Sequence, residues 1–379
     1  PAGPVYVGVP ADLLRAPAPA PEAAPAKGDP PPPDAFDLPA QRPLVWAGGG
    51  AVDAQAEVVA LAERLGAPIL TTYAGRGIGA GHPLAVGLPP HLPEVGALWD
   101  AADVVISVGS DLDGMNTQNW RMPQPPVLIA VNTDREDATK NNDAQHVDQA
   151  DAAAGCDALA RVLAQAPWAD LVAVRDTAWT RLRGEHPPEA AFLDAFAAAV
   201  PEEAVVLADM CIPGYWLAGF HGVPAPRRLQ YPMGWGTLGF AFPASLGAAC
   251  APGAGERPVV SVSGDGGFLF ACGELATVAQ ERLPLTTVIV DDGGYGMLRF
   301  DQRANGREAF GVDLHTPDHV ALARSFGIEA EAVDGLGEDF SAALARHVAR
   351  PEPTVLVARA ALEPPPTTSP RWYRTAQDA

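Results

Sequence analysis

The sequence predicts an α/β protein made of two three-layer domains, each with a parallel sheet covered by helices on both faces. Short β-rich runs alternate with helix-like stretches along most of the 379 residues, and this alternation is typical of parallel sheets. The length corresponds to two or three domains. Hydrophobic residues form 48% of the chain and charged residues 19%, which is enough apolar material for buried cores.

The net charge argues against several classes of partner. The chain carries 46 acidic residues against 25 basic ones, giving a formal charge of −21. Such a surface repels phosphate backbones and anionic lipids, so we expect neither nucleic acid nor a membrane as a partner. An anionic ligand would have to be held by positive groups close to it, such as a metal ion or backbone N–H groups.

Cysteine usage indicates a reducing compartment. The four cysteines contain no C-x-x-C pair and lie far apart in the sequence: Cys156, Cys211, Cys250 and Cys272. Neither a zinc site nor a disulfide framework is indicated. We therefore expect buried free thiols in a cytoplasmic protein.

One long uncharged segment, residues 229–255, invites a test for a membrane span. It is rich in Gly, Ala and Pro, with Pro243 in its middle. A spanning helix usually has about 20 strongly apolar residues. A helix buried between the layers of an α/β domain fits this composition better.

The N-terminal part indicates the end of a preceding unit. The chain opens at Pro1 rather than Met, and residues 4–10 form an apolar run typical of a strand. Residues 1–16 are thus expected to be the remnant of a truncated or processed domain. Residues 17–40 are rich in Pro and Ala without periodicity, which predicts an extended linker.

The elements of the first α/β unit follow this linker, and the unit is expected to end near residue 165. Short apolar runs predict its strands, which are residues 44–47, 68–72, 103–109 and 127–131. The triple glycine at residues 48–50 separates the first strand from a helix predicted over residues 52–65.

A second unit repeats the alternation. Its predicted strands are residues 205–208, 259–262, 285–290 and 354–358, and its predicted helices are residues 238–250, 274–280 and 320–326. Pro243 is expected to interrupt the first of these helices near its start. The tail from Pro364 has no periodic pattern and is expected to be a loop.

Two acidic turns carry the predicted chemistry. Asp265 follows one predicted strand within Gly264, Gly266 and Gly267, and Asp292 follows the next strand, 27 residues later. Ligands in open parallel sheets bind beyond the carboxyl ends of strands. Carboxylate oxygens on a rigid rim suit Mg²⁺ shared with a phosphate, and the glycines allow backbone N–H groups to approach an anion.

Ordinary turns are the alternative, since Gly and Asp dominate turns in general. A single Gly-Asp-Gly would be weak support for a site. Two acidic turns at this spacing, each directly after a β-rich run, favour a metal–phosphate site more strongly.

The run from Gly264 to Gly296 resembles the thiamin-diphosphate motif, which begins Gly-Asp-Gly and closes about thirty residues later with Asn-Asn. The resemblance covers most of the chain and is closest to enzymes of the acetolactate synthase and benzoylformate decarboxylase type. It implies that residues 1–14 end a pyrimidine-binding domain. It further implies a Rossmann-like central domain over residues 41–165 and a diphosphate-binding domain over residues 185–365.

The resemblance also implies roles for individual residues. Asp265, Asp292 and the backbone carbonyl of Gly294 would hold Mg²⁺. Gly264, Gly266, Gly267 and Tyr295 would lie near the diphosphate. Leu238 would support the bent cofactor from below, and the carbonyl of Gly236 would accept a hydrogen bond from its aminopyrimidine. Met297 and Leu298 would line the substrate pocket, although simple core packing explains these two residues equally well.

Two departures from the family pattern matter. Asp291 and Asp292 replace Asn-Asn, which adds a carboxylate beside the metal. The family's catalytic glutamate belongs to the pyrimidine-binding domain, so no residue of this chain is assigned a catalytic role. The chain alone is expected to bind the cofactor poorly and to turn over little.

The implied activity is Mg²⁺- and thiamin-diphosphate-dependent processing of a 2-oxoacid. Carboligation, as in acetolactate synthesis, is favoured slightly over simple decarboxylation. The implied partner is either a second copy, giving a dimer or tetramer, or a chain that supplies the pyrimidine-binding domain. A non-catalytic cofactor-binding scaffold is a rival hypothesis.

Weaker sequence patterns raise the question of other ligands, namely a nicotinamide dinucleotide, FAD or a histidine-bound metal. The glycines at 48–50 raise a nicotinamide-dependent dehydrogenase as an alternative, but Asp53 stands where a dinucleotide motif needs its last glycine. Relatives often bind FAD in the central domain. The segment 109–113 lacks the arginine of the flavin-binding acetolactate synthases, which favours a central domain without FAD. His82, His91 and His315 show no metal-ligand spacing.

Overall fold

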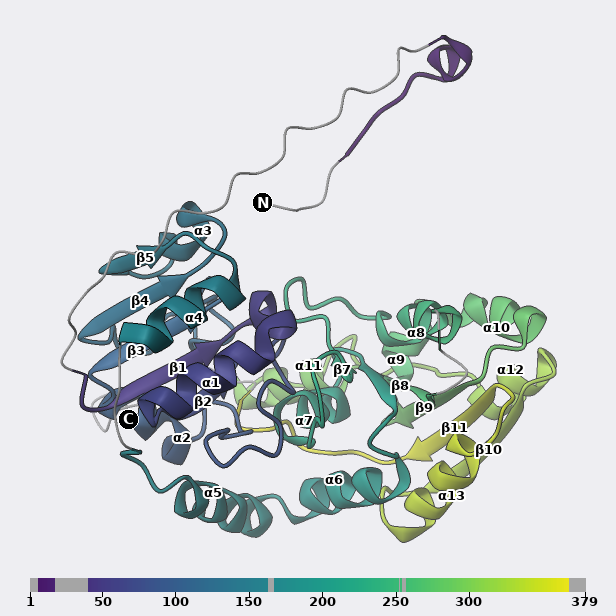
Figure 1. The fold of residues 1–379 in the computed structure, drawn as a ribbon. Coiled ribbons are helices and arrows are strands. Elements are labelled where there is room, and N and C mark those ends of the chain that lie inside the picture. Colours follow the sequence, from purple (N-terminus) through teal and green to yellow (C-terminus); the bar gives the residue numbers. More distant parts are fainter. Residues whose placement is uncertain (1–5, 18–39, 163–166, 252, 254–256, 368–379) are drawn as a thin grey trace.

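The structure, a computed structural model, describes residues 6–17, 40–162, 167–251, 253 and 257–367 (Figure 1). Its described part contains a five-stranded sheet formed by the N-terminal half and a six-stranded sheet formed by the C-terminal half. All strand pairs in both sheets are parallel. The predicted fold class, two parallel-sheet α/β domains, is confirmed.

The first sheet has the strand order β2-β1-β3-β4-β5. Its strands are β1 (Pro43–Ala47), β2 (Ile69–Thr71), β3 (Val104–Val108), β4 (Val127–Val131) and β5 (His146–Asp148). The four longer apolar runs were predicted within two residues at each end. The edge strand β5 was missed because three residues with two polar side chains carry no strand pattern.

Alternate side chains of the first sheet enter two different cores. Leu44 and Trp46 of β1 pack on the side of α2 (Pro93–Ala101) and α5 (Leu171–Glu185). Val45 and Ala47 pack on the side of α1 (Gln55–Leu65) and α4 (Ala152–Val162). This alternation is what a strand buried on both faces requires. The short elements η2 (Gly49–Ala54) and α3 (Arg135–Thr139) complete the unit.

The second sheet has the order β10-β11-β9-β8-β6-β7. Its strands are β6 (Val205–Ala208), β7 (Leu229–Gln230), β8 (Val259–Gly264), β9 (Leu285–Asp291), β10 (Glu329–Asp334) and β11 (Thr354–Arg359). Strands β8 and β9 are direct neighbours, and Gly264 pairs with Val290. The two acidic turns therefore leave the same edge of the sheet side by side.

Helices cover both faces of the second sheet as well (Figure 1). One face contacts α8 (Ala241–Cys250), α10 (Leu275–Glu281) and α12 (His319–Ser325), and the other α6 (Pro187–Ala199), α7 (Ile212–Phe220) and α13 (Glu338–Val348). The remaining short elements are η1 (Ala11–Arg15), α9 (Asp265–Phe268), η4 (Cys272–Glu274) and α11 (Gly296–Ala304). The helix predicted over residues 238–250 begins only at Ala241. Pro243 lies in its first turn, where the missing N–H costs no hydrogen bond, so the proline marks the helix start and interrupts nothing.

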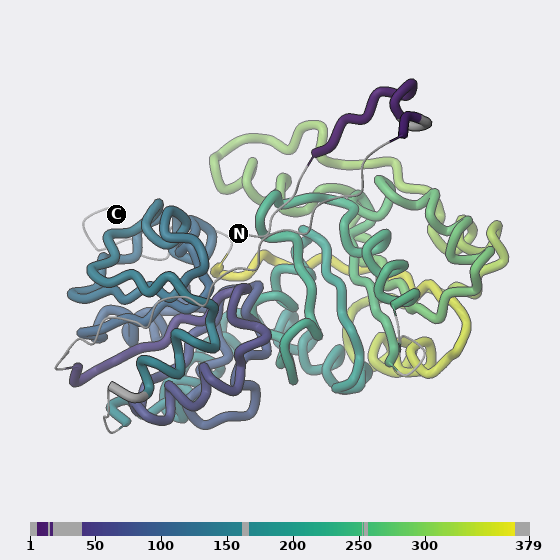
Figure 2. Tube along the Cα trace, turned by 45° about the horizontal axis from the view of Figure 1, so that its top comes forward, coloured from purple at the N-terminus to yellow at the C-terminus, as the bar shows by residue number. Residues whose placement is uncertain are grey.

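One apolar core runs through both units. Leu44 and Trp99 from the first unit belong to the same buried cluster as Phe196, Trp216 and Phe340 from the second. After β11 the chain returns toward the first sheet (Figure 2), and the indole N–H of Trp216 donates to the carbonyl of Glu363 at 2.8 Å. The two sheets are thus joined by a shared interior as well as by the chain.

The expected N-terminal strand is wrong for the residues that the structure describes. Residues 6–10 form no strand and are followed by the 3₁₀ helix Ala11–Arg15. Tyr6 is 95% exposed, since this segment pairs with no neighbouring strand. Most of the predicted linker, residues 18–39, lies outside the described residues.

The uncharged segment after Leu229 ends in α8, a ten-residue helix. No helix within the described ranges is long and apolar enough to span a bilayer.

Candidate cofactor site

The carboxyl ends of three adjacent strands, β6, β8 and β9, surround a cavity of about 220 Å³. The cavity brings together most of the residues that the sequence singled out. These are Gly236, Leu238, Gly264, Asp265, Gly267, Asp292, Gly294, Tyr295, Met297 and Leu298. Sequence positions more than sixty residues apart therefore form one site.

Asp265 lies directly after β8 and is 1% exposed. Both of its carboxylate oxygens are buried without a hydrogen-bond partner of normal geometry among the described residues. Burial, together with the nearby charge of Asp292, raises the pKa of this carboxyl to about 7. Such an uncompensated carboxylate is costly unless a cation accompanies it.

Asp292 follows β9 and faces the same cavity. Its Oδ1 is buried without a hydrogen bond among the described residues, and the guanidinium of Arg299 lies 3.8 Å away. Burial raises the pKa of Asp292, and Arg299 offsets this only in part. A side chain at Gly296 would overlap Oδ2 of Asp292, so this glycine makes room for the carboxylate.

The neighbouring Asp291 has a different task. Its Oδ1 accepts the backbone N–H of Gly293 at 3.1 Å, which closes the turn after β9. Gly294 has φ +150°, and a Cβ there would overlap the carbonyl oxygen of Val312. The two aspartates that replace Asn-Asn therefore differ in role: Asp291 stabilises the turn, and Asp292 faces the cavity.

The glycines after β8 allow close approach. A Cβ on Gly266 would lie 2.8 Å from the ring of Tyr295, so the ring packs directly on this turn. A Cβ on Gly267 would lie 2.8 Å from Oδ2 of Asp209. Both positions demand glycine for packing, and both leave backbone N–H groups near the carboxylates.

The predicted support segment lies on the other side of the cavity. Gly236 has φ +61°, its N–H donates to the carbonyl of Pro232 at 3.0 Å, and Leu238 lines the cavity. Trp235 beside them is 97% exposed. Gly236 and Leu238 thus line the cavity, whereas residues 241–250 form the buried helix α8.

Sequence reasoning missed the contribution of β6. Asp209 follows this strand, and Met210, Cys211, Ile212 and Tyr215 line the cavity. The same rule that found Asp265, an acidic residue directly after a predicted strand, would have found Asp209. Burial raises the pKa of the Cys211 thiol well above its usual range. The thiol is therefore un-ionised and forms an apolar part of the cavity lining.

Met297 and Leu298 begin helix α11 at the cavity. Met297 also packs against the main core, whereas Leu298 is 50% exposed. Core packing therefore accounts for Met297 in part and does not account for Leu298.

Gly49 and Gly50 of the triple glycine border a separate cavity of about 590 Å³ in the first unit. The N–H of Gly50 already donates to the carbonyl of Gly109 at 2.9 Å. Asp111, Asp113 and Asp137 line this cavity, and Lys140 is paired with the first and last of them. These carboxylates do not favour a pyrophosphate, and a central domain without FAD stays a prediction.

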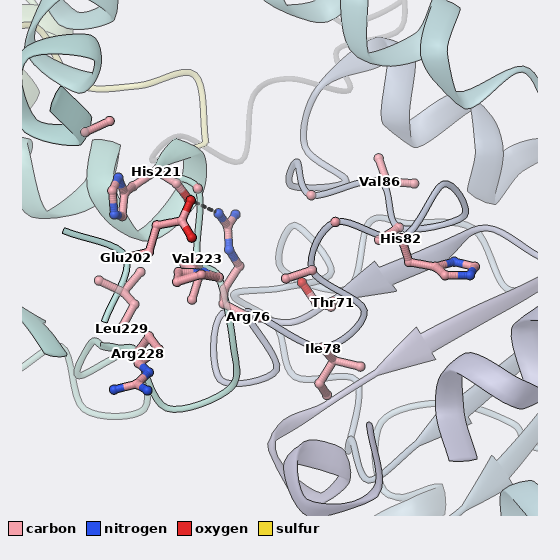
Figure 3. A pocket seen from close by; sticks show the side chains of 18 of the residues that line it. Thr71, Arg76, Ile78, His82, Val86, Glu202, His221, Val223, Arg228 and Leu229 are labelled. Atoms are coloured by element: carbon pink, nitrogen blue, oxygen red, sulfur yellow. Dashed lines mark hydrogen bonds between the residues drawn. The ribbon is translucent and has the colours of Figure 1, made fainter. Parts of the chain in front are cut away.

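A third cavity, of about 780 Å³, lies between the two units (Figure 3). Arg76, only 7% exposed, donates to the carbonyls of Gly219 and His221 at the C-terminal end of α7. Cations are favoured at this end of a helix dipole. This cavity is remote from the acidic turns, and its buried arginine serves the contact between the units.

The donor set at the first cavity fits a metal-bound diphosphate. Among the residues that the structure describes, no group of three His, Cys, Asp or Glu side chains could hold a metal on its own. Two neighbouring carboxylates with three buried oxygens that accept no hydrogen bond among the described residues instead suit a Mg²⁺ ion whose other ligands are a backbone oxygen and phosphate oxygens. The buried oxygens of Asp265 and Asp292 are the observation that supports this fit.

The fold and this cavity define an α/β protein that binds a ligand at the carboxyl edge of a parallel sheet. Comparison with known families agrees: residues 38–159 match the thiamine pyrophosphate enzyme central domain, and residues 211–358 match the C-terminal thiamine-pyrophosphate-binding domain of the same enzymes. The chain belongs to the thiamine pyrophosphate enzymes.

Similar proteins carry three kinds of name. The chain is 33% identical to "Probable 2-ketoarginine decarboxylase AruI" of Pseudomonas aeruginosa, over 79% of this chain and 55% of the relative. It is 32% identical to the acetolactate synthase isozyme 2 large subunit of Escherichia coli, over 78% of this chain and 55% of the relative. A sulfoacetaldehyde acetyltransferase of Alcaligenes xylosoxydans is 27% identical, over 82% of this chain and 58% of the relative. The chain thus spans little more than half the length of these relatives.

Proposed function

We propose that this chain holds Mg²⁺ and thiamin diphosphate for the decarboxylation of a 2-oxoacid, with carboligation to a second carbonyl compound as the further step favoured by the sequence. The observation that carries the proposal is the placement of Asp265 and Asp292 at the ends of two adjacent strands, where both oxygens of Asp265 and Oδ1 of Asp292 are buried without a hydrogen bond among the described residues. Membership of the thiamine pyrophosphate enzymes supports the choice of cofactor.

In this proposal, different residues of the cavity bind different parts of the cofactor and the metal. Asp265, Asp292 and the carbonyl of Gly294 hold the metal, and the backbone around Gly264, Gly266 and Gly267 approaches the diphosphate, with Tyr295 packed on the turn. Leu238 and the carbonyl of Gly236 support the other end of the cofactor. When bound, thiamin diphosphate supplies an electron sink for loss of CO₂. Met297 and Leu298 exclude water from the substrate.

Decarboxylation alone is the alternative outcome. One relative is named a decarboxylase and another an acetolactate synthase, at 33% and 32% identity. The two reactions share the loss of CO₂ and differ in whether a proton or a second carbonyl compound is taken up. The cavity lining is compatible with both.

A pyrimidine-binding domain completes the site in this proposal. It comes from a second copy of the full-length protein, in a dimer or tetramer, or from a partner chain. A scaffold that binds the cofactor without turnover is the rival hypothesis. The four free thiols support a reducing compartment, and we propose the cytoplasm.

Calorimetry with Mg²⁺ and thiamin diphosphate tests the cofactor, with and without the pyrimidine-binding domain. We expect uptake that needs Mg²⁺ and that strengthens when the domain is present. The reassembled protein is then given 2-oxoacids, and the products are separated. An aldehyde indicates decarboxylation, a hydroxy-oxoacid indicates carboligation, and bound cofactor with no product supports the scaffold. Absence of Mg²⁺-dependent uptake in the reassembled protein would contradict the proposal.

A further inference from the structure

A fully buried carboxylate lies directly behind the cofactor cavity. Asp209 follows β6, is 0% exposed and does not line the cavity, although its neighbour Met210 does. Burying a carboxylate without compensation costs several kcal/mol, on the order of the ion's desolvation. Burial accordingly raises the pKa of Asp209, and backbone N–H groups lower it in part.

The compensation comes from the backbone of the segment that supports the cofactor. Oδ2 of Asp209 accepts the N–H of Gly239 at 2.9 Å, and Oδ1 accepts the N–H of Phe240 at 3.0 Å. The N–H of Met210 also reaches Oδ1, at 3.1 Å. Gly239 and Phe240 directly follow Leu238, so one side chain fixes the backbone on which Leu238 is mounted.

The same carboxylate also contacts the diphosphate turn. A Cβ on Gly267 would lie 2.8 Å from Oδ2 of Asp209. Gly239 has φ +73°, and a Cβ there would lie 2.7 Å from Cβ of Phe270 and 3.2 Å from the carbonyl oxygen of Gly267. Asp209 therefore contacts both the Gly239 segment and the Gly267 turn, which pack against each other beside the cavity, and the two glycines allow this close packing.

We propose that Asp209 is a positioning residue that fixes the segment carrying Gly236 and Leu238 against the Gly264–Gly267 turn, and so sets the width of the cofactor cavity. This inference rests on the proposed function, because the width matters only if a cofactor bridges the two turns.

The charge of Asp209 and its role as a hydrogen-bond acceptor have opposite expected effects on cofactor binding. A carboxylate beside a diphosphate site repels the ligand, so removing its charge alone should strengthen cofactor binding. Loss of the acceptors that hold Gly239 and Phe240 should weaken binding instead. The two effects have opposite signs.

The test uses Asp209→Asn, which keeps the shape and one acceptor oxygen but cannot accept all of these N–H groups. Asp148→Asn is the matched control, since Asp148 is also a buried aspartate at the end of a strand, is 8% exposed and lies in the other sheet. Hydrogen exchange of the chain without cofactor is measured first. Thiamin diphosphate affinity is then measured at saturating Mg²⁺ in whichever assembly of the wild type binds it.

We expect amide exchange of Gly239 and Phe240 to accelerate in Asp209→Asn by roughly tenfold or more, with the strands of both sheets unchanged. We expect thiamin diphosphate affinity to fall by a similar factor, while Asp148→Asn leaves both quantities as in the wild type. Unchanged exchange at these two amides, or tighter cofactor binding, overturns the inference. Absence of cofactor binding by the wild type instead overturns the proposed function, and the exchange result still stands.

Gly239→Ala provides a second route if Asp209→Asn does not fold. It leaves the carboxylate intact but forces the left-handed backbone at φ +73° to carry a side chain that meets Phe270. We expect the same faster exchange at Phe240 and the same weaker cofactor binding. Wild-type affinity in this variant would overturn the inference.

Discussion

At the scale of single residues, the site depends on which carboxylates lack partners. Asp265 has two buried oxygens without partners, whereas its neighbour in space, Asp291, uses an oxygen to close a turn. Burial and the charge of Asp292 raise the pKa of Asp265 to about 7, which disfavours its ionised form. A bound cation is what makes that ionisation favourable.

Asp265→Asn should therefore weaken Mg²⁺-dependent uptake of thiamin diphosphate by at least about tenfold, because a charged ligand oxygen is lost. Asp291→Asn makes the same change of charge, but the amide oxygen can still accept the N–H of Gly293. We expect it to bind nearly as the wild type does. Calorimetric titration of both variants checks the difference, and equal losses would place the metal elsewhere on this edge.

A buried histidine in the first unit predicts a pH dependence. His91 is 2% exposed, its Nε2 lies 3.0 Å from the carbonyl oxygen of Met115, and burial lowers its pKa from 6.5 to about 4. The unfolded chain takes up this proton at a higher pH than the folded chain does. Its contribution to stability is therefore complete above pH 6.5 and is lost as the pH falls toward 4.

The loss between pH 7 and pH 5 should be roughly 2 kcal/mol of unfolding free energy. His91→Gln, which keeps a donor for Met115 but does not titrate, should lose less over the same interval. Urea denaturation at the two pH values measures both. Parallel pH profiles of the two proteins would show that His91 does not contribute.

The acidic turns could be found from the sequence because each follows an apolar run and stands among glycines. Asp209 also directly follows a strand, but it has no neighbouring glycine, so the sequence pattern did not mark it as a site residue. The requirement for Gly296 could not be predicted, since it depends on the direction in which the side chain of Asp292 points.

At the scale of elements, buried strands with β-branched runs were predictable and polar edge strands were not. β10 has the sequence EAEAVD, in which acidic side chains alternate with alanines, and such a pattern is also typical of an exposed helix. Helices α5 and α13 do carry boundary signals, namely the N-cap Asp170 and the acidic first turn and basic last turn of α13, but neither helix was predicted. Their positions depend on packing against the sheets, which a single sequence does not reveal.

Helix α7 links the two units, because Arg76 from the first unit binds its C-terminal carbonyls while its first residues line the cofactor cavity. Arg76→Met should lower the unfolding free energy by about 2–3 kcal/mol, since it leaves these buried carbonyls without donors. Arg227 also joins the units, through Asp53, but this pair lies on the surface. Arg227→Met should therefore change stability little.

Denaturant unfolding of both variants measures the contrast. Equal effects would mean that burial of the Arg76 contact adds nothing to stability.

At the scale of the whole molecule, the shared core predicts cooperative unfolding. Trp46 and Trp99 of the first unit, 5.3 Å apart between ring centroids, belong to the same buried cluster as Trp216 of the second. We expect variants that retain tryptophans of only one unit to show coincident fluorescence transitions in urea. Two separated midpoints would contradict a single cooperative core.

The exposed Trp235 allows assembly to be followed by fluorescence. Its indole projects almost wholly into water beside Gly236, at the edge of the cavity. Any chain that covers this edge must transfer the indole to a drier environment, and its emission then moves to the blue. The protein thus contains its own fluorescent reporter for the binding of a chain at this edge, and the Trp235→Phe variant is the control that lacks this signal.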